Sequence, residues 1–261
     1  MDVSEPRVTT PWHAREMDME AGMTWIDGDL LGFDLETTGV DRFSDRPVSF
    51  ALVRVAGGAV RDCLAGLVDP GMAIPVGATA VHGISTERAR AEGQPLDRAV
   101  TVMVDELVKA SNSGIPVVGM KLDFDLTILD IQCRRVDGRG LATRGFSGAV
   151  IDALVLDRHV DRYRRGRRRL GDLCSHYGVS IDHAHDARAD AEASVLVVTE
   201  IIRRHPELAL MELEDLHRSE IQWHREWAES FDQWRREHGQ DPLDPGEFEW
   251  PVPGGLNVSV T

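Results

Sequence analysis

The chain has 261 residues, 42% of them hydrophobic, which is enough to bury one large domain or one domain with an extension. Its 29 lysines and arginines face 44 acids, and the net charge of −15 argues against a protein held on nucleic acid or membrane by overall charge. Three scattered cysteines without a Cys-x-x-Cys pair indicate neither a disulfide framework nor a cysteine zinc site. No signal-peptide pattern and no apolar run of about 18 residues is present, so we expect a cytoplasmic protein with no membrane partner.

The first predicted element with chemical content is a strand that carries two acids. Residues 1–26 lack a sustained period and are expected to form a flexible leader. The run Leu30–Glu36 then predicts a buried strand on which Asp34 and Glu36 leave the same face. Two such charges about 4 Å apart repel by roughly 4 kcal/mol at an effective dielectric near 20, so burial of the pair indicates a metal site. An isolated Asp-x-Glu is more often a strand end that points into solvent.

The next segments predict a sheet with crossover helices. Two strands around the Gly57-Gly58 turn are typical of an antiparallel hairpin, and residues 80–95 are expected to form a polar turn. The elements expected after it are a helix from Leu96 to about Gly114, a strand over 117–120, a helix capped by Asp123 with Asp125 in its first turn, and a last strand over 150–154.

An arginine cluster follows the last predicted strand. Seven arginines fall within twelve residues of an otherwise acidic chain: Arg158, Arg162, Arg164, Arg165, Arg167, Arg168 and Arg169. Such a concentration could contact a phosphate backbone, and Arg164, Arg165, Arg167 and Arg168 are the candidate contacts. A solvated surface loop is the alternative interpretation.

A histidine and an aspartate are predicted to meet at the start of a long helix. If Asp186 is the N-cap, His185 precedes the cap and Asp190 is the fourth helical residue, two positions that meet across a helix start. His185 and Asp190 are therefore expected to face one another. A lone histidine near a helix start more often lies on the surface or takes part in capping.

The C-terminal part is acidic and rich in tryptophan. Trp223, Trp227, Phe231 and Trp234 recur at spacings of four, four and three, which places them on one stripe of an amphipathic helix. Such a stripe more often docks on the protein's own core than it stacks with bases. Residues 239–261, with four prolines, are expected to form an extended tail.

Three segments together resemble the motifs of a known enzyme family. They resemble, in order, the exonuclease motifs of the DEDDh 3′-to-5′ exonucleases, the family of the bacterial DNA polymerase III epsilon (proofreading) subunit. The segments are Phe33-Asp34-Leu35-Glu36-Thr37-Thr38-Gly39, Val118-Gly119 with Phe124-Asp125, and His185 followed five residues later by Asp190. The resemblance covers about residues 30–202, and one departure is Met120-Lys121 where family members commonly have His-Asn.

The resemblance implies a fold, a site and cofactors. The fold is α/β, a mixed five-stranded sheet flanked by helices (ribonuclease H-like), with an exonuclease domain over residues 27–205 and a helical extension over 206–261. Asp34, Glu36, Asp125 and Asp190 would hold two divalent cations, Mg²⁺ or Mn²⁺, and His185 would be the general base. The residues expected to bind the terminal nucleotide are Thr37, His82, Ile84 and Phe124.

The implied activity is hydrolysis at the 3′ end of single-stranded or frayed DNA, with release of nucleoside 5′-monophosphates in proofreading or repair. An exoribonuclease that trims RNA ends is one alternative, since only contacts to the sugar separate the two substrates. A non-catalytic module that binds a DNA polymerase through the tryptophan-rich extension is another. The intact acids favour an enzyme over the non-catalytic module, which the extension would allow as an additional role.

Overall fold

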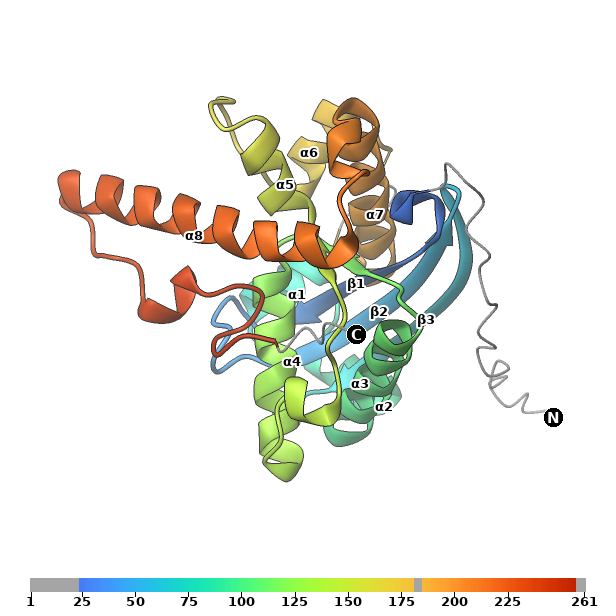
Figure 1. Ribbon diagram of the computed structural model, residues 1–261. Helices are drawn as coiled ribbons and strands as arrows, with labels where there is room; N and C mark the ends of the chain where they lie inside the picture. Colours follow the sequence, from blue (N-terminus) through green and yellow to red (C-terminus); the bar gives the residue numbers. More distant parts are fainter. Residues whose placement is uncertain (1–23, 181–184, 257–261) are drawn as a thin grey trace.

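A computed structural model describes residues 24–180 and 185–256. Within them a six-stranded mixed sheet of order β4-β3-β2-β1-β5-β6 separates two layers of helices (Figure 1). Most of the predicted leader, residues 1–23, lies outside the described residues, and Trp25–Asp27 form a short 3₁₀ helix. None of the helices in the described ranges is both long and apolar enough to cross a membrane.

The strands confirm the predicted mixed sheet and add one short strand at its edge. Antiparallel β1 and β2, and β2 and β3, form the hairpin part, whereas β5 and β6 run parallel to β1. The two-residue β4 pairs with β3 and is the strand that the sequence did not predict. The strands are β1 Asp29–Thr37, β2 Pro47–Ala56, β3 Ala59–Asp69, β4 Gln94–Pro95, β5 Val117–Gly119 and β6 Val150–Asp152.

Three helices were not predicted, α1, α2 and α5. Helix α5 begins at Ala153, inside the segment expected to be the last strand, because Asp152 accepts a hydrogen bond from the Leu154 N–H and caps a helix there. Two short helices, α1 and α2, occupy the segment expected to be a turn, because Ser85 accepts a hydrogen bond from the Arg88 N–H and caps a new helix there. The helices are α1 Val76–His82, α2 Thr86–Glu92, α3 Leu96–Asn112, α4 Leu122–Asp137, α5 Ala153–Val160, α6 Leu170–Tyr177, α7 Ala187–Arg204 and α8 Leu213–Glu237.

Alternation along β1 divides the interior into two cores. Leu31, Phe33 and Leu35 pack with α3 and α4 on one face of the sheet. Leu30 packs on the other face, with α5, α6 and α7. Because side chains alternate along a strand, Asp34 and Glu36 leave the face that α7 covers. The alternation along β1 and the packing of α7 on this face therefore direct both carboxylates toward α7.

Helix α4 begins at Leu122, two residues earlier than expected, and the prediction that Asp123 caps it is wrong. The carboxylate of Asp152, at the end of β6, accepts hydrogen bonds from the N–H groups of Lys121 (3.0 Å) and Leu122 (2.8 Å). Asp123 lies inside the first turn and pairs with Arg42 at 2.8 Å. A partner distant in sequence thus supplies the cap, which local spacing could not reveal.

The C-terminal segment folds back onto the domain. Helix α8 is present as predicted, but the tail is not extended over its described part, because Trp250, Val252 and Leu256 are buried in the first core. The Trp250 ring lies 5.3 Å from that of His217 on α8. Burial of these apolar side chains outweighs the extended bias of the prolines around them. Residues 257–261 lie outside the described part of the chain.

Candidate active site

A close contact between β1 and α7 sets the position of the first acids. Gly32 lies two residues before Asp34 on the same face, and a Cβ there would lie 2.7 Å from the Ala191 carbonyl oxygen of α7. No side chain larger than hydrogen allows this approach without a shift of the helix. The start of α7 therefore reaches Asp34 and Glu36 because residue 32 is glycine.

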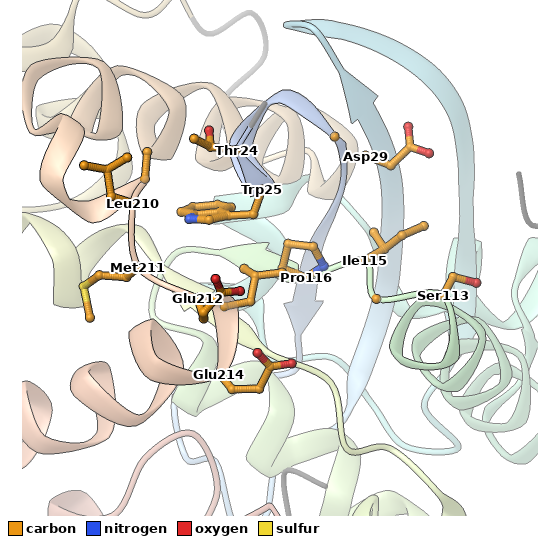
Figure 2. Close-up of a pocket in the computed structure, with 14 residues that line it drawn as sticks. Thr24, Trp25, Asp29, Ser113, Ile115, Pro116, Leu210, Met211, Glu212 and Glu214 are labelled. Atoms are coloured by element: carbon orange, nitrogen blue, oxygen red, sulfur yellow. The ribbon is translucent and has the colours of Figure 1, made fainter. Parts of the chain in front are cut away.

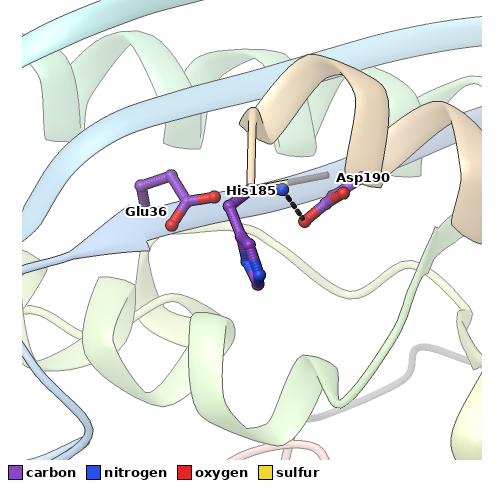
Figure 3. A group of neighbouring side chains, drawn as sticks. All are labelled: Glu36, His185 and Asp190. Atoms are coloured by element: carbon purple, nitrogen blue, oxygen red, sulfur yellow. Dashed lines mark hydrogen bonds between the residues drawn. The ribbon is translucent and has the colours of Figure 1, made fainter. Parts of the chain in front are cut away.

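The start of α7 presents the next two groups as predicted. Asp186 is the N-cap, and its carboxylate accepts hydrogen bonds from the N–H groups of Arg188 and Ala189. The backbone N–H of His185 donates to Asp190 Oδ2 at 3.3 Å (Figure 3). His185 has a φ of 69°, a left-handed conformation that is unfavourable for a residue with a Cβ. This backbone strain at a helix start is typical of a functional position.

Asp125 reaches the end of β1 from the other side of the sheet. Parallel pairing of β1 with β5 is confined to Leu31 and Gly32, after which β5 gives way to α4. The Leu35 N–H, left without a strand partner, donates to Asp125 Oδ1 at 3.2 Å. This bond holds the Asp125 carboxylate at the end of the strand that carries the other two acids. Because β5 has only three residues, the end of β1 is left open on this side, and Asp125 joins the site there as its fourth carboxylate.

The four carboxylates destabilise one another's charged forms. Burial raises the pKa of Asp34 well above its ordinary value, and the charges of Asp125, Asp190 and Glu36 add to the effect. Burial, with the nearby charge of Asp190, raises the pKa of Glu36 to about 8. Burial is also the main cause of the raised pKa values of Asp125 and Asp190. Such a cluster favours a bound cation or retained protons.

Asp190 has a buried oxygen without a partner among the described residues. Its Oδ1 accepts no hydrogen bond from them, although unpaired buried polar atoms are rare in folded proteins. Ligand atoms of Glu36, His185 and Asp190 lie within 4.8 Å of one another, a group that could hold a metal ion (Figure 3). An oxygen ligand left unpaired next to other acids has the chemistry that Mg²⁺ and Mn²⁺ prefer.

A groove of about 310 Å³ adjoins these groups. Glu36 and His185 line it together with the predicted nucleotide contacts His82 and Ile84. His82 Nδ1 accepts the Ile84 N–H at 3.1 Å, which leaves the proton on Nε2. Burial, followed by the nearby His185, lowers the pKa of His82, so the ring is neutral at pH 7. Nε2 is buried beside the Thr37 backbone, without a well-formed hydrogen bond to it.

Two predicted nucleotide contacts lie outside the described lining of this groove. The Thr37 hydroxyl donates to the Gly39 carbonyl at 2.7 Å. Phe124 packs against the first core, and the Lys121 ammonium lies 5.3 Å from its ring centre. Lys121, the residue before α4, has a φ of 62°. Helix α4, which carries Asp125, therefore follows a residue in the left-handed conformation, as α7 follows His185. Asparagine, which the related motif has here, adopts that conformation at lower cost.

The arginine cluster divides into buried and exposed members. Arg164 Nη2 donates to both oxygens of the fully buried Asp157 (2.7 and 2.6 Å), and Arg168 donates to the same carboxylate. Tyr177 also donates to Asp157, at 2.8 Å. The contacts of Arg164 and Arg168 are therefore structural, which the sequence interpretation missed because their partner precedes the cluster. The other two candidate phosphate contacts, at positions 165 and 167, are exposed.

Asp152 is the residue of this region whose role the sequence analysis missed. Besides capping α4, it caps α5 through the Leu154 N–H at 2.8 Å. Its own N–H donates to Glu220 Oε2 of α8 at 2.9 Å. An aspartate between a strand and a helix is an ordinary N-cap signal, and only the contact with α4 links it to Asp125.

A second cavity, of about 460 Å³, lies at the opposite edge of the sheet (Figure 2). Trp25, Pro116, Leu210 and Met211 line it near the start of β1. None of the candidate catalytic residues belongs to its described lining. The candidate catalytic residues lie instead at the carboxyl ends of the parallel strands, where ligands bind in many sheets of this kind.

Comparison with known proteins gives one family and one fold. A family model described as Exonuclease (RNase_T) matches residues 31–198. A PolC-type DNA polymerase III of Lacticaseibacillus paracasei is 31% identical over 162 residues, which are 62% of this chain and 10% of that protein. E. coli Exonuclease I, solved with a dT13 oligonucleotide, matches with a TM-score of 0.57 and 22% identity over 69% of this chain and 42% of that one. Exonuclease I of Methylocaldum szegediense matches with a TM-score of 0.56 and 22% identity over 80% of this chain and 45% of that one.

Proposed function

This chain belongs to the exonuclease family, and on that premise we propose that it removes nucleotides from the 3′ ends of DNA. The reaction is hydrolysis of the terminal phosphodiester bond, with release of a nucleoside 5′-monophosphate. The chain spans only about a tenth of the curated polymerases that it resembles, so this activity is proposed for the chain itself. The likeness to a replicative polymerase supports a role in proofreading or repair.

The observation that carries the proposal is the meeting of four carboxylates and one histidine at a single sheet edge. Asp34 and Glu36 come from β1, Asp125 from α4, and His185 and Asp190 from the start of α7. Their mutual repulsion and the unpaired Asp190 Oδ1 fit bound cations, because cations would relieve both. The four carboxylates would hold two divalent ions, Mg²⁺ or Mn²⁺.

The bound ions would neutralise negative charge that develops on the attacking and leaving oxygens of a phosphodiester. Within this arrangement His185 accepts a proton from the attacking water on a ring nitrogen. Its side chain is exposed and lines the groove beside Glu36, so both water and substrate can reach it. His82 and Ile84, which line the groove, contact the terminal nucleotide.

The test compares three variants with the wild-type chain on DNA and RNA oligonucleotides labelled at the 5′ end, with Mg²⁺, Mn²⁺ or chelator. Asp34→Asn and Asp190→Asn are expected to lose at least 100-fold in rate, and Asp105→Asn, an exposed carboxylate on α3, to keep the wild-type rate. Shortening from the 3′ end of DNA supports the proposal. Equal rates for all three variants would refute the ligand assignment, and preferential shortening of RNA would make the chain an exoribonuclease.

A second readout separates metal binding from catalysis. Because burial and neighbouring acids raise the pKa of Asp34, its charge opposes folding when no cation is bound. Asp34→Asn is therefore expected to melt at or above the wild-type temperature in chelator and to lose the rise in melting temperature that Mg²⁺ produces in the wild type. An undiminished rise would contradict the assignment even if activity were lost.

A further inference from the structure

The C-terminal segment, residues 206–256, contacts the helix that carries Asp125. It lies outside residues 31–198, which the exonuclease family model matches. In Figure 1, α8 crosses the domain above α4, and the chain that follows α8 returns below it toward α4. Trp250 of this returning chain is buried in the same core as Leu122, the first residue of α4. The C-terminal segment therefore packs against the beginning of the helix that presents a candidate metal ligand.

Asp152 connects the C-terminal segment to the beginning of α4. Its carboxylate, which accepts the N–H groups of Lys121 and Leu122, belongs to a residue that is buried. The segment holds Asp152 from two sides. Glu220 Oε2 accepts the Asp152 N–H at 2.9 Å, and Trp250 Nε1 lies 3.5 Å from Asp152 Oδ2. Because the residue that caps α4 is enclosed by packed neighbours, its position depends on the C-terminal segment.

A second connection reaches the first turn of α4 through Arg42. Arg42 Nη1 lies 2.8 Å from Asp123 Oδ2, and only 12% and 9% of the two side chains are exposed. Arg42 Nη2 lies 3.9 Å from Glu247 Oε1 in the C-terminal segment. Glu247 is itself fixed to α8, because its carbonyl oxygen accepts a hydrogen bond from His224 Nε2 at 2.9 Å. The C-terminal segment is thus linked to the first turn of α4 as well as to its cap.

Asp125 depends on the beginning of α4 for its position. Within the described ranges, the hydrogen bond from the Leu35 N–H, at 3.2 Å, is the one that its carboxylate accepts from another element. The charges of Asp34 and Asp123 lie close enough to repel it. Asp125 is the fourth residue of α4, so a shift of the first turn moves its carboxylate. Metal–ligand distances vary by only about 0.2 Å, so a small shift of this turn weakens metal binding.

We propose that the C-terminal segment positions the Asp125 carboxylate for metal binding, through its contacts with Asp152 and Arg42. Glu220 and Trp250 are then positioning residues that touch neither metal nor substrate. The inference rests on the proposed exonuclease function and extends the site to residues outside the matched family region. A segment that only stabilised the fold would change the melting temperature and leave the metal affinity of the folded chain unchanged. Loss of a residue that orients a metal ligand lowers that affinity, typically by about 10- to 100-fold.

The experiment measures metal binding without cleavage, by calorimetric titration of the full chain with Mn²⁺ in the absence of DNA. Asp152→Asn and Glu220→Leu are expected to bind Mn²⁺ about 10- to 100-fold more weakly than the wild type. Trp250→Phe, which keeps a buried ring and removes the Nε1–H, is expected to show a smaller loss. Glu220→Gln keeps an oxygen that accepts the Asp152 N–H and should therefore bind like the wild type.

Asp130→Asn is the matched control for these variants. Asp130 is also a buried aspartate, and it accepts a backbone hydrogen bond from Leu141 at 2.7 Å, but it lies on α4 beyond the first turn. Its replacement is expected to lower the melting temperature and to leave the Mn²⁺ affinity unchanged. The melting temperature of each variant in chelator shows that the chain is folded under the conditions of the titration.

The outcomes separate this inference from the proposed function. Wild-type Mn²⁺ affinity in folded Glu220→Leu and Trp250→Phe would overturn the positioning role of the C-terminal segment alone, whatever Asp152→Asn does. An equal loss of affinity in Asp130→Asn would overturn it as well, because the effect would then follow stability. A wild-type chain that binds Mn²⁺ but does not shorten DNA or RNA would refute the exonuclease proposal alone. A wild-type chain that binds no Mn²⁺ would refute the ligand assignment and the positioning role together.

Discussion

Replacing Gly32 by alanine would test whether the contact of β1 with α7 organises the site. The new Cβ would lie 2.7 Å from the Ala191 carbonyl oxygen and 3.0 Å from Val195 Cγ2. Nonbonded carbon contacts are normally about 3.5–4.0 Å, so the helix must withdraw by a large part of an ångström. The atom nearest to the new methyl belongs to backbone, which cannot rotate away. Asp190 and His185, at the start of α7, would move with the helix.

Two effects of different size are expected from this substitution. Overpacking of a tight contact costs about 1–3 kcal/mol of unfolding free energy. A displacement of about 1 Å between catalytic groups costs on the order of 100-fold in rate. Gly32→Ala is therefore expected to stay folded, because it removes only part of the typical 5–15 kcal/mol of a domain, and to be nearly inactive.

Chemical denaturation and the 5′-labelled oligonucleotide assay measure the two effects. Gly171→Ala is the matched control, since it makes the same change on α6, where no described atom beyond the helix's own neighbouring backbone lies within 4 Å of the new Cβ. Alanine at that helical position should stabilise the chain by about 0.4–1 kcal/mol and leave the rate unchanged. Wild-type stability and rate in Gly32→Ala would refute the reasoning, because α7 would then not depend on this contact.

Three further predictions concern residues around the site. Lys121→Asn should raise the unfolding free energy by up to about 1 kcal/mol, because asparagine tolerates the left-handed φ of 62° better than lysine. Asp157→Ala should cost about 3–5 kcal/mol in denaturation, since it leaves two arginine side chains without their partner. Burial, with the nearby Asp152, raises the pKa of Glu220 well above its ordinary value. The unfolded chain therefore loses this proton first as pH rises from about 4.3, and Glu220→Gln should gain stability relative to wild type at each higher pH.

Each of these predictions has a clear contrary result. A less stable Lys121→Asn would mean that the lysine side chain over Phe124 outweighs the backbone strain. A loss of less than about 1 kcal/mol of unfolding free energy in Asp157→Ala would mean that the guanidinium groups of Arg164 and Arg168 hydrogen-bond to water in place of the carboxylate. A difference between Glu220→Gln and wild type that does not change with pH would mean that Glu220 is ionised in the folded chain.

Local patterns in the sequence were sufficient for most of the elements and for most of the candidate site. A spacing of two along a strand puts Asp34 and Glu36 on one face, and an N-cap followed by helical spacing brings His185 to Asp190. Both relations depend on residues within five positions of each other, so one segment contains them. The resemblance of three motifs added Asp125, which no local pattern joins to the others.

Contacts that reach beyond a single helix or strand decided the remaining features. Asp157 binds two of the arginines, and Asp152 caps α4 in place of Asp123. Trp250 is buried against α8 although prolines flank its segment. In each case the partner is chosen by the way the sheet and helices pack, which a periodicity along one segment does not encode.

The sequence by itself determined which acids share a face and which helix starts carry polar groups, because strand and helix periods are properties of neighbouring residues. Only the tertiary structure decided that these groups meet. A glycine on β1 lets α7 approach, and the early end of β5 frees the Leu35 N–H for Asp125. The packing of α8 on β6 likewise brought the rings of Trp223 and Trp227 against His159 and Arg158 of α5. These arrangements depend on distances between elements, which are fixed when the two cores pack.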